Sequence, residues 1–453
     1  MNASYIVIFF FLFLLIYGFT AKSKNLLDYT FSSRKLTVPA LVATLVTTWY
    51  GGINEIGIEV IHNGLTTWIY FGLFYYITAL IYALYIVPKI IEKNHTSIPL
   101  LMLHSYGKYP ALITTFILFF YLLPAPYILI LGQIISQIFE YNLLISIIIG
   151  LLFSTLYTLK GGFNSIIKTD QIQFILMFFG FIILFITLIS SDSFGISSFK
   201  NLYNLRPDLL TIPGNSNWSY ILMFAFLSLL TFLDPSFYQR TFAGKDLKTV
   251  KKSILIAIIF WFIFDFMTIS IALIYIENAL SNNMNPLITS SPYIEIAKTA
   301  FNNNSIFMGI FFVSILSVVM STIDSYTFLA SLTIKYDLNR ILNKKDTEIN
   351  SIKLGTILVL SISFLLTQFF DRALYFWYYF GGYLLISTFV PLLSSLFNIK
   401  IFRVTKMMLI SILLTLIWEF MIFYNISNLP SVYIGLSFSF LWVLMPKLKS
   451  YAF

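Results

Sequence analysis

Apolar runs, each about twenty residues long, recur from one end of this chain to the other and leave few folds open to it. Such a run crosses a bilayer as an α-helix, because a helix satisfies its backbone polar groups internally. Hydrophobic residues make up 58% of the 453 residues and charged residues only 10%, which excludes a water-soluble domain of this size. The absence of cysteine excludes disulfides and thiolate metal sites. The sequence therefore predicts an all-α polytopic membrane protein.

The runs predict about thirteen transmembrane helices in a single transmembrane domain that spans 1–453. The leading helix, at 5–20, has no basic segment before it and no small-residue cleavage site after it, so we expect it to be retained. The other helices are predicted at 38–61, 65–88, 110–139, 142–159, 169–191, 218–238, 252–276, 305–335, 351–370, 373–398, 405–424 and 430–446.

The basic residues predict the orientation of these helices. When the loops are assigned alternately to two sides, all but four of the 28 Lys and Arg fall on one side. The exceptions are Lys200, Arg206, Lys298 and Arg372. Because cytoplasmic loops carry the excess of Lys and Arg, we expect the N-terminus outside a cell membrane and the C-terminus in the cytoplasm. This role accounts for the net charge of +9 without a nucleic-acid partner.

The helix at 305–335 carries polar residues where they are most costly. Five of them lie at spacings of three and four and therefore share one face: Ser314, Ser317, Ser321, Asp324 and Ser325. Lipid cannot satisfy these groups, so the face must meet a partner or a wet cavity. Oxygen-only ligands suit a small hard cation, so we interpret the face as an ion site in a transporter. The alternative, hydroxyls bonded to a carbonyl one turn earlier, leaves Asp324 unexplained.

The span at 38–61 is interrupted by glycine. Gly51, Gly52 and Gly57 lower its helix propensity where Glu55 and Glu59 stand one turn apart. We interpret it as a discontinuous helix that lines a cavity, because broken backbone inside a membrane needs ions, water or substrate as partners. The alternative is close helix packing through the glycines, with both glutamates at a wet outer end.

Two aspartates are further candidates. Asp234 precedes Pro235, which removes a backbone donor, so Asp234 either meets ligand or caps a kinked helix. Asp170 stands at the predicted start of a span, where it either serves the ion site or caps the helix. Arg240 is expected to anchor the cytoplasmic end of its helix. The sequence leaves open whether three other acids are functional or structural: Glu59, Asp265 and Glu419.

The span at 373–398 begins with an aromatic and flexible half. Its residues are Trp377, Tyr378, Tyr379, Gly381 and Gly382. We expect either contact with substrate or, as is usual for aromatic stripes in membrane helices, packing and interfacial anchoring.

With these residues in place, the chain resembles the sodium:solute symporter family, whose members carry sugars, proline, sialic acid, vitamins and iodide. The resemblance covers most of the length and rests on the order and spacing of several short motifs. These motifs are Thr48-Trp-Tyr-Gly-Gly52, His62-Asn-Gly-Leu65, Gly161-Gly162 with Thr169-Asp-Gln-Ile-Gln173, Asp234-Pro-Ser-Phe-Tyr-Gln-Arg240 with Ala243-Gly-Lys245, and Ser321-Thr-Ile-Asp-Ser325.

The resemblance implies a LeuT-like fold in which five core helices, at 38–191, are related to five more, at 218–398, as inverted repeats. One helix precedes this core and two, at 405–446, follow it. The resemblance also implies a sodium site made by the hydroxyls of Ser321 and Thr322 with the backbone carbonyls of Gly51, Asn54 and Val318.

Some members hold a second cation nearby. The positions that match in this chain are Asp170, Ser321, Asp324 and Ser325. Asp324 stands where some of those proteins have serine, so its carboxyl group either strengthens a second cation site or accepts a proton.

The family binds solute beside the sodium site. The resemblance implies solute contacts from Glu55, Ile58, Asp234, Ser236, Tyr127, Gln133, Trp377 and Tyr378. Carriers of carboxylates often have an arginine on the third core helix, and 110–139 contains none. Because a buried carboxylate without a basic partner is costly, Glu55 and Asp234 favour a cationic or a hydroxyl- and amide-rich solute.

We therefore expect sodium-coupled symport of a small organic solute by alternating access, in a unit that works as a monomer in the bilayer. Na⁺ is the coupling ion, and no other cofactor is expected. One alternative keeps the fold and couples to protons through Asp324 or Glu55. Another is a membrane sensor, which normally adds a signalling domain that is not expected here, because the chain stops soon after its last helix. An enzyme is not expected, because the intramembrane acids are dispersed along separate helices.

Overall fold

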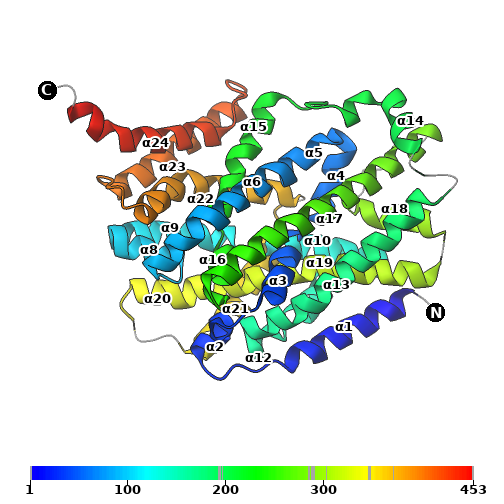
Figure 1. The fold of residues 1–453 in the computed structure, drawn as a ribbon, viewed down its shortest axis with the longest axis horizontal. Helices are drawn as coiled ribbons and strands as arrows, with labels where there is room; N and C mark the ends of the chain where they lie inside the picture. Colours follow the sequence, from blue (N-terminus) through cyan, green and yellow to red (C-terminus); the bar gives the residue numbers. More distant parts are fainter. Residues whose placement is uncertain are drawn as a thin grey trace.

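The computed structural model describes residues 3–191, 195, 197–283, 286, 291–302, 304–344, 348–370 and 372–450, the last six as backbone only. Across these residues the chain is helical and has no β-strand; Leu36 and Gly244 form an isolated bridge. Figure 1 shows the long helices packed side by side and running diagonally across the view, with the N-terminus at the right and the C-terminus at the upper left. The predicted all-α fold class is confirmed.

The helices have the following bounds. They are α1 (Ala3–Phe19), α2 (Leu26–Phe31), η1 (Ser32–Arg34), α3 (Val38–Trp49), α4 (Ile53–Asn63), α5 (Thr66–Trp68), η2 (Ile69–Leu73), α6 (Phe74–Ile81), η3 (Tyr82–Ile86), α7 (Val87–Lys93), α8 (Ile98–Tyr106), α9 (Lys108–Tyr121), α10 (Ala125–Phe139), α11 (Leu143–Thr155), α12 (Thr158–Gly161), α13 (Phe163–Ile189), α14 (Ser197–Leu205), η4 (Pro207–Leu210), α15 (Trp218–Leu227), η5 (Ser228–Phe232), α16 (Pro235–Ala243), α17 (Leu247–Ser281), α18 (Pro292–Phe301), α19 (Ser305–Leu332), η6 (Thr333–Asp337), α20 (Leu338–Ile341), α21 (Ile349–Leu366), α22 (Ala373–Leu396), α23 (Val404–Phe423) and α24 (Ser431–Ser450).

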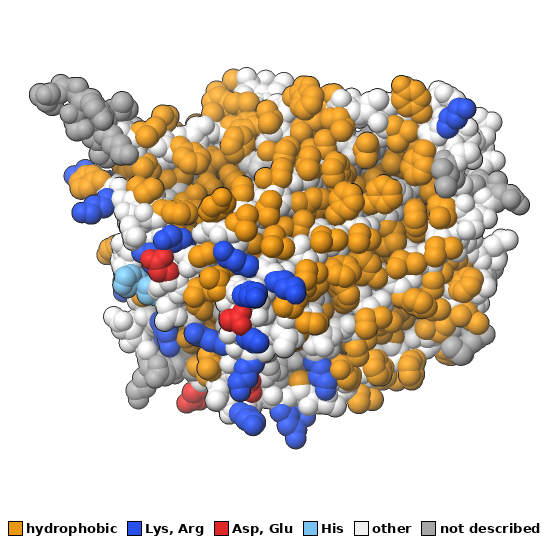
Figure 2. Space-filling view, viewed as in Figure 1, with side chains coloured by type: hydrophobic (Ala, Val, Ile, Leu, Met, Phe, Trp, Pro, Cys, Tyr) orange, Lys and Arg blue, Asp and Glu red, His pale blue; other side chains and the backbone are white. Residues whose placement is uncertain are grey.

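Ten helical segments in the described part of the chain are long and apolar enough to cross a membrane. Three shorter apolar helices, Ala3–Phe19, Val38–Trp49 and Ser431–Leu444, complete the thirteen apolar segments expected from the sequence. Figure 2 shows a broad apolar band over the visible face, whereas Lys and Arg gather toward its lower left. An apolar surface of this extent needs lipid as its solvent, which agrees with a multi-pass membrane protein.

The first core span is broken, as its glycines predict. α3 ends at Trp49 and α4 begins at Ile53, so the helix is interrupted at residues 50–52. A Cβ atom on Gly51 would lie only 2.5 Å from Cβ of Thr322 on α19. Glycine is therefore required for the break to pack this closely against α19.

A second break lies in the sixth core span. η5 ends at Phe232 and α16 begins at Pro235, a residue that favours the first position of a helix. The Asp234 carboxylate caps the new helix by accepting a hydrogen bond from the Ser236 amide at 2.7 Å. The helix continues to Ala243, beyond its predicted end, and this corrects the role expected for Arg240. Arg240 is only 2% exposed and lies inside the protein, so it does not anchor the helix at the surface.

Two further differences from the prediction bear on the site. The third core span is two helices, α9 and α10, separated at Leu122–Pro124, where Pro124 and Pro126 lack backbone donors. α13 begins at Phe163, directly after Gly162, whose φ of +57° lies in the left-handed region. Asp170 is therefore inside α13, and the alternative that it caps this helix is excluded.

α19 lies at the centre of the molecule. Every residue from Phe311 to Leu332 is buried. The helix packs against α1, α3, α10, α13 and α21, which surround it in Figure 1. Its hydroxyl and carboxylate groups therefore face protein rather than lipid, as their cost in a bilayer requires.

Candidate ion and solute site

The candidate ion site lies where the end of α3 meets α19. The Thr322 hydroxyl donates to the carbonyl oxygen of Thr48 at 3.0 Å and approaches that of Val318 at 3.4 Å. Gly51 lies against the Thr322 side chain. Three oxygens from two helices that are distant in sequence therefore meet at the break.

The break also supplies partial charges. The last carbonyls of α3 have no partner within that helix and carry the negative end of its dipole. The first amides of α4 carry the positive end of a second dipole. An interrupted helix of this kind can therefore hold a cation at the end of α3 and a polar or anionic group at the start of α4.

The predicted sodium ligands are brought together in part. Gly51, Val318 and Thr322 meet at the break. The Ser321 hydroxyl instead donates to Oδ1 of Asp170 at 2.6 Å. Nδ2 of Asn54 donates to Oγ of Ser291 at 2.8 Å. The hydroxyl that points toward the broken helix is therefore that of Thr322.

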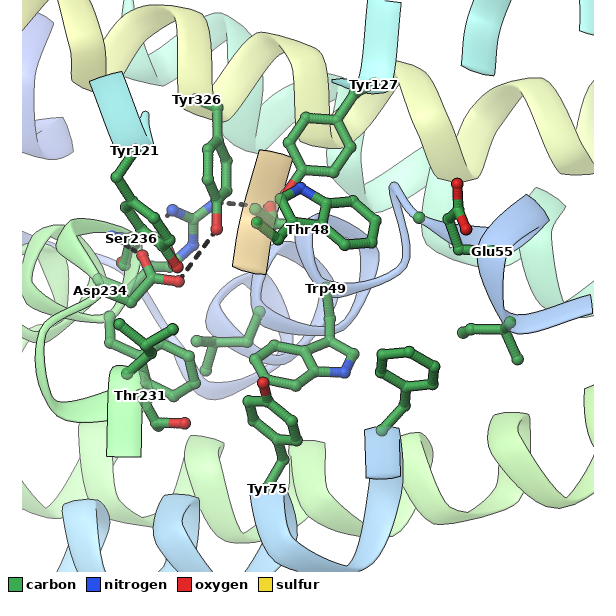
Figure 3. Close-up of a pocket in the computed structure, with 18 residues that line it drawn as sticks. Thr48, Trp49, Glu55, Tyr75, Tyr121, Tyr127, Thr231, Asp234, Ser236 and Tyr326 are labelled. Atoms are coloured by element: carbon green, nitrogen blue, oxygen red, sulfur yellow. Dashed lines mark hydrogen bonds between the residues drawn. The ribbon is translucent and has the colours of Figure 1, made fainter. Parts of the chain in front are cut away.

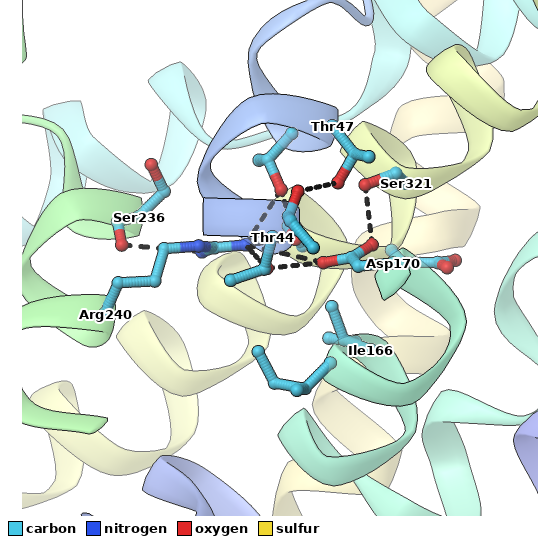
Figure 4. A network of polar contacts seen from close by, with 12 residues as sticks. Thr44, Thr47, Ile166, Asp170, Ser236, Arg240 and Ser321 are labelled. Atoms are coloured by element: carbon cyan, nitrogen blue, oxygen red, sulfur yellow. Dashed lines mark hydrogen bonds and ion pairs between the residues drawn. The ribbon is translucent and has the colours of Figure 1, made fainter. Parts of the chain in front are cut away.

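A buried guanidinium lies beside this site (Figure 4). Nη2 of Arg240 donates to three hydroxyl oxygens, those of Thr44 at 2.7 Å, Thr48 at 2.8 Å and Ser325 at 2.9 Å. The same nitrogen is 3.9 Å from Oδ2 of Asp170, which accepts a hydrogen bond from Thr44. The positive charge of Arg240 and the negative charge of Asp170 are thus paired inside the membrane domain.

Asp324 points elsewhere. Its Oδ2 atom accepts a hydrogen bond from the hydroxyl of Tyr157, and its Oδ1 atom has no hydrogen-bond partner among the described residues. The four residues predicted for a second cation therefore separate into two groups. Asp170, Ser321 and Ser325 belong to the network around Arg240, whereas Asp324 is paired with Tyr157.

A cavity of about 140 Å³ lies between the two broken helices (Figure 3). Its wall is rich in aromatic side chains, which include Trp49, Tyr75, Tyr121, Tyr127, Tyr326 and Trp377. Tyr127 links two of these rings, with centroids 5.2 Å from Tyr326 and 5.5 Å from Trp377. The cavity thus offers flat apolar faces together with hydroxyl groups.

The polar part of the wall comes from the two breaks. It consists of Thr48, Glu55, Thr231, Asp234, Ser236 and Arg240. Oδ2 of Asp234 accepts a hydrogen bond from the Tyr326 hydroxyl at 3.1 Å, as Figure 3 shows. The wall also contains a basic group, Arg240 on the sixth core span, which the absence of arginine from 110–139 did not predict.

Glu55 is held by ionic contacts on one side of the cavity. Arg372 bonds Oε2 of Glu55 at 2.7 Å and Oε1 of Glu59 at 3.0 Å, and the amide of Ala373 bonds Oε1 of Glu55 at 2.9 Å. Burial lowers the pKa of Arg372, but Glu55 and Glu59 outweigh burial and raise the pKa above its ordinary value. These contacts join α4 to the start of α22, so Glu55 is already paired rather than free for a cationic solute.

Three of the eight predicted solute contacts do not line the cavity. They are Ile58, Gln133 and Tyr378, whereas Glu55, Asp234, Ser236, Tyr127 and Trp377 do line it. Two of the acids left open have structural contacts. Asp265 accepts a hydrogen bond from Tyr76, and Glu419 accepts hydrogen bonds from Tyr383 at 2.6 Å and Ser431 at 3.2 Å.

The sequence reasoning missed Arg240, Thr44 and the cavity contact of Thr48. The spacing of 44, 48 and 51 does place two hydroxyls on the face that carries the glycine break. For Arg240 the signal was Pro235, because proline at the start of a helix indicates a new helix rather than the end of the old one.

Comparisons of the sequence and of the structure find similar known proteins. A sequence model described as "Sodium:solute symporter family" matches residues 29–407, which is most of the chain. The sodium/pantothenate symporter of Haemophilus influenzae is 31% identical over 174 residues. That alignment spans 38% of this chain and 35% of the relative, so it covers about a third of the relative's length.

Two solved structures share the fold. A Na⁺-coupled sialic acid symporter, in a substrate-bound outward-open state, has a TM-score of 0.81 at 14% identity, with coverage of 100% of this chain and 98% of the other. Mhp1, a transporter of the nucleobase-cation-symport-1 family, has a TM-score of 0.51 at 13% identity, with coverage of 92% and 95%. At this identity both matches describe the fold alone, and the fold agrees with the predicted LeuT-like architecture.

Proposed function

Because the chain belongs to the sodium:solute symporter family, we propose that it carries a small organic solute across the membrane together with sodium. The observation that carries this proposal is the meeting of Thr322, Gly51 and the last carbonyls of α3. The hydroxyl of Thr322 and the carbonyl oxygens at the end of α3 form an oxygen-rich site where that end packs against the middle of α19.

In the proposed cycle, sodium binds between the end of α3 and Thr322 and holds α3 against α19. This contact fixes the position of the break, which forms part of the wall of the solute cavity. Sodium therefore raises the affinity for solute, and solute raises the affinity for sodium by the same factor. The membrane potential favours inward movement of each positive charge by about 2.3 kcal/mol per 100 mV.

The cavity supports a solute rich in hydroxyl or amide groups. Its aromatic faces suit a compact organic molecule, and Thr48, Asp234 and Ser236 offer hydrogen bonds. The relatives' names refer to pantothenate and sialic acid, both of which combine hydroxyl and amide groups with a carboxylate. Arg240 in the wall is paired with Asp170, and Glu55 is paired with Arg372. Neither of these charges therefore selects between an anionic and a cationic solute.

The arrangement in the membrane belongs to the same proposal. We assign the N-terminus to the outside and the C-terminus to the cytoplasm of the cell membrane, residues 38–191 and 218–398 to the two inverted repeats, and a single chain to the working unit. In this orientation Arg372 lies on the outer side of the cavity, and Arg240 lies on its cytoplasmic side.

A thermal-shift screen tests the proposal. Purified protein is unfolded with each of a set of candidate solutes, once in sodium chloride and once in choline chloride at the same pH. The proposal predicts a solute whose stabilising effect requires sodium, because each ligand that binds only the folded state adds to stability. Stabilisation that is equal in choline and varies only with pH would contradict sodium coupling and favour proton coupling.

A further inference from the structure

Another cavity, of about 440 Å³, lies on the side of the molecule whose loops carry most of the Lys and Arg. The wall of this basic cavity comes from three parts of the chain: α2 with η1, the turn between α7 and α8 with the start of α8, and η6 with α20. Figure 1 shows α2, α8 and α20 at the left and lower left, where Lys and Arg gather in Figure 2. Volumes of about 300–1,000 Å³ are typical of small-molecule sites, so the basic cavity can hold a small organic molecule.

The wall of the basic cavity carries positive charge. It includes Arg34, His95 and Arg340, whereas no Asp or Glu among the described residues lines it. The two guanidinium groups lie over aromatic rings, Arg34 over Phe242 at 5.6 Å and Arg340 over Tyr336 at 4.4 Å. In the described part of the chain neither guanidinium has a carboxylate oxygen within 4.0 Å. Both positive charges are therefore available to a ligand.

The acids on the elements around the basic cavity have other partners. The pairs are Asp28 with Ser33 at 3.0 Å, Glu92 with Lys89 at 2.8 Å and Asp337 with Ser97 at 2.7 Å. Burial, together with the positive charges of His104 and Lys93, lowers the pKa of His95. The potential in the basic cavity is therefore positive, which favours an anion there.

The donors in this wall suit phosphate. A guanidinium presents its N–H groups in a plane that matches the oxygens of a phosphate or a carboxylate. The side chains of Asn94 and Thr96 add neutral donors to those of Arg34 and Arg340. A phosphate group has more acceptor oxygens and more negative charge than a carboxylate, so it can use several of these donors at once.

The two arginines belong to different parts of the molecule. Arg34 lies just before Leu36, whose amide donates to the carbonyl of Ala243 at 3.0 Å and whose carbonyl accepts from the amide of Lys245 at 3.1 Å. This segment is therefore joined to the end of α16 and leads directly into α3. Arg340 lies on α20, which packs against α8 and α9. A ligand that bonds both arginines joins these two parts.

We propose that the basic cavity binds a phosphate-bearing anion through Arg34 and Arg340, and that the bound anion ties the segment before α3 to α20. The anion thereby restrains the two segments, α3 and α16, that adjoin the helix breaks. It acts from a separate site, because no described residue lines both the basic cavity and the solute cavity. The phosphate belongs to a small soluble molecule or to a lipid headgroup at the same membrane surface.

Isothermal titration calorimetry of purified protein in detergent with potassium pyrophosphate tests the inference. The titration is run at constant ionic strength and without sodium or solute, so its result does not depend on sodium coupling. The wild type is expected to bind one pyrophosphate. Arg34→Gln and Arg340→Gln each remove a charge-assisted contact, and each is expected to raise the Kd at least about tenfold. Both side chains are exposed, so both variants are expected to fold.

Arg403→Gln is the matched control. Arg403 is also exposed, has a positive φ of 52° as Arg34 has one of 57°, and lies over an aromatic ring, that of Phe402 at 4.8 Å. It does not line the basic cavity, so its substitution is expected to leave the Kd for pyrophosphate unchanged.

Native mass spectrometry distinguishes the two sources of phosphate. The protein is mixed with equal amounts of phosphatidylglycerol and phosphatidylcholine before detergent is removed. If the occupant is a lipid headgroup, the wild type and Arg403→Gln retain phosphatidylglycerol and the two cavity variants lose it. If the occupant is soluble, pyrophosphate binds and all four proteins retain the same lipids.

Two results would overturn the inference. One is a wild type that binds no pyrophosphate and retains the same lipids as Arg34→Gln and Arg340→Gln. The other is an affinity for pyrophosphate that is equal in the wild type and in both cavity variants, because the anion would then bind elsewhere. Neither result bears on sodium-coupled transport, which is tested separately.

Discussion

At the scale of single residues, the buried hydroxyl groups of α19 bond to two different neighbouring helices, α3 and α13. The hydroxyl of Thr322 points at the broken helix, and that of Ser321, one residue earlier, points at Asp170. The two side chains differ by about 100° around the helix, so they serve different neighbours although they are adjacent in sequence. The sequence predicts which face is polar. It cannot assign partners, because Ser321 and Asp170 are joined only by tertiary packing.

The first prediction concerns Thr322. Thr322→Val keeps the shape of the side chain but removes the hydroxyl, which costs about 1 kcal/mol of stability through the lost hydrogen bond. We expect the affinity for sodium to fall at least about tenfold, which corresponds to about 1.4 kcal/mol. The measurement is the thermal stability of the protein as a function of sodium concentration.

Thr356→Val is the matched control for this experiment. Thr356 is also buried and bonds a carbonyl one turn earlier, that of Ile352 at 3.2 Å, but it lies on α21 away from the break. It is expected to leave the sodium dependence unchanged. If the thermal stability of Thr322→Val depends on sodium concentration as that of the wild type does, Thr322 is not a sodium ligand.

The second prediction concerns the ionic contact between Arg372 and Glu55. Arg372→Gln removes the charge that joins the start of α22 to α4, so the side of the cavity near Arg372 should open more often. The Arg372 side chain is 29% exposed, and water screens part of its interaction. We therefore expect an increase of several-fold, up to about tenfold, in the rate at which a cysteine at Phe71 in the cavity wall reacts with a maleimide.

Arg206→Gln provides the control. Arg206 is also in an ion pair, with Asp208, but it does not line the cavity. Equal labelling rates in Arg372→Gln and in the Arg206 control would mean that the contact does not limit access.

At the scale of helices, the two interruptions decide where the site forms. Both breaks were expected at residues that disfavour a continuous helix, the glycines at 51–52 and Asp234-Pro235. The first was located correctly because glycine lowers helix propensity directly. The second was placed at the end of a span, although the helix restarts at Pro235 and continues inside the protein to Ala243. Charged residues usually lie at the ends of membrane spans, so a buried arginine such as Arg240 is wrongly predicted to lie at the membrane surface.

The third prediction tests the close packing at the first break. Gly51→Ala places a Cβ atom 2.5 Å from Cβ of Thr322, so α3 and α19 must separate. Overpacking of this kind costs about 1–3 kcal/mol, and we expect a lower Tm together with a weaker stabilising effect of sodium. Gly382→Ala, whose Cβ atom would meet Val432 at an ordinary 3.5 Å, is the control and should leave both quantities nearly unchanged. If sodium stabilises Gly51→Ala and Gly382→Ala equally, the break is not part of the ion site.

At the scale of the whole molecule, the ends of the apolar segments were predicted to within six residues, because length and hydropathy are properties of the sequence. The cavity was not predictable in the same way. Its wall combines residues from the first, second, third, sixth, eighth and tenth core spans, and only packing brings these together. Ile58, Gln133 and Tyr378 are on the predicted helices but do not line this cavity, and their contact with solute stays a prediction.

The fourth prediction concerns orientation, and the absence of cysteine makes it simple to test. Asn428→Cys introduces a single thiol at an exposed position between α23 and α24, and Asn350→Cys introduces one at an exposed position in the first turn of α21. On intact cells an impermeant maleimide should label Asn428→Cys, and it should label Asn350→Cys only after the membrane is permeabilised. The reverse pattern would place the C-terminus outside.

The most direct test of sodium-coupled symport is accumulation of the solute identified by the thermal-shift screen in proteoliposomes. An inward sodium gradient is imposed while the pH is clamped to the same value on both sides. The account predicts uptake against the solute's own gradient that rises with the sodium gradient and with an inside-negative potential, and that is lost in Thr322→Val. Accumulation that persists without sodium, or that follows only an imposed proton gradient, would contradict it.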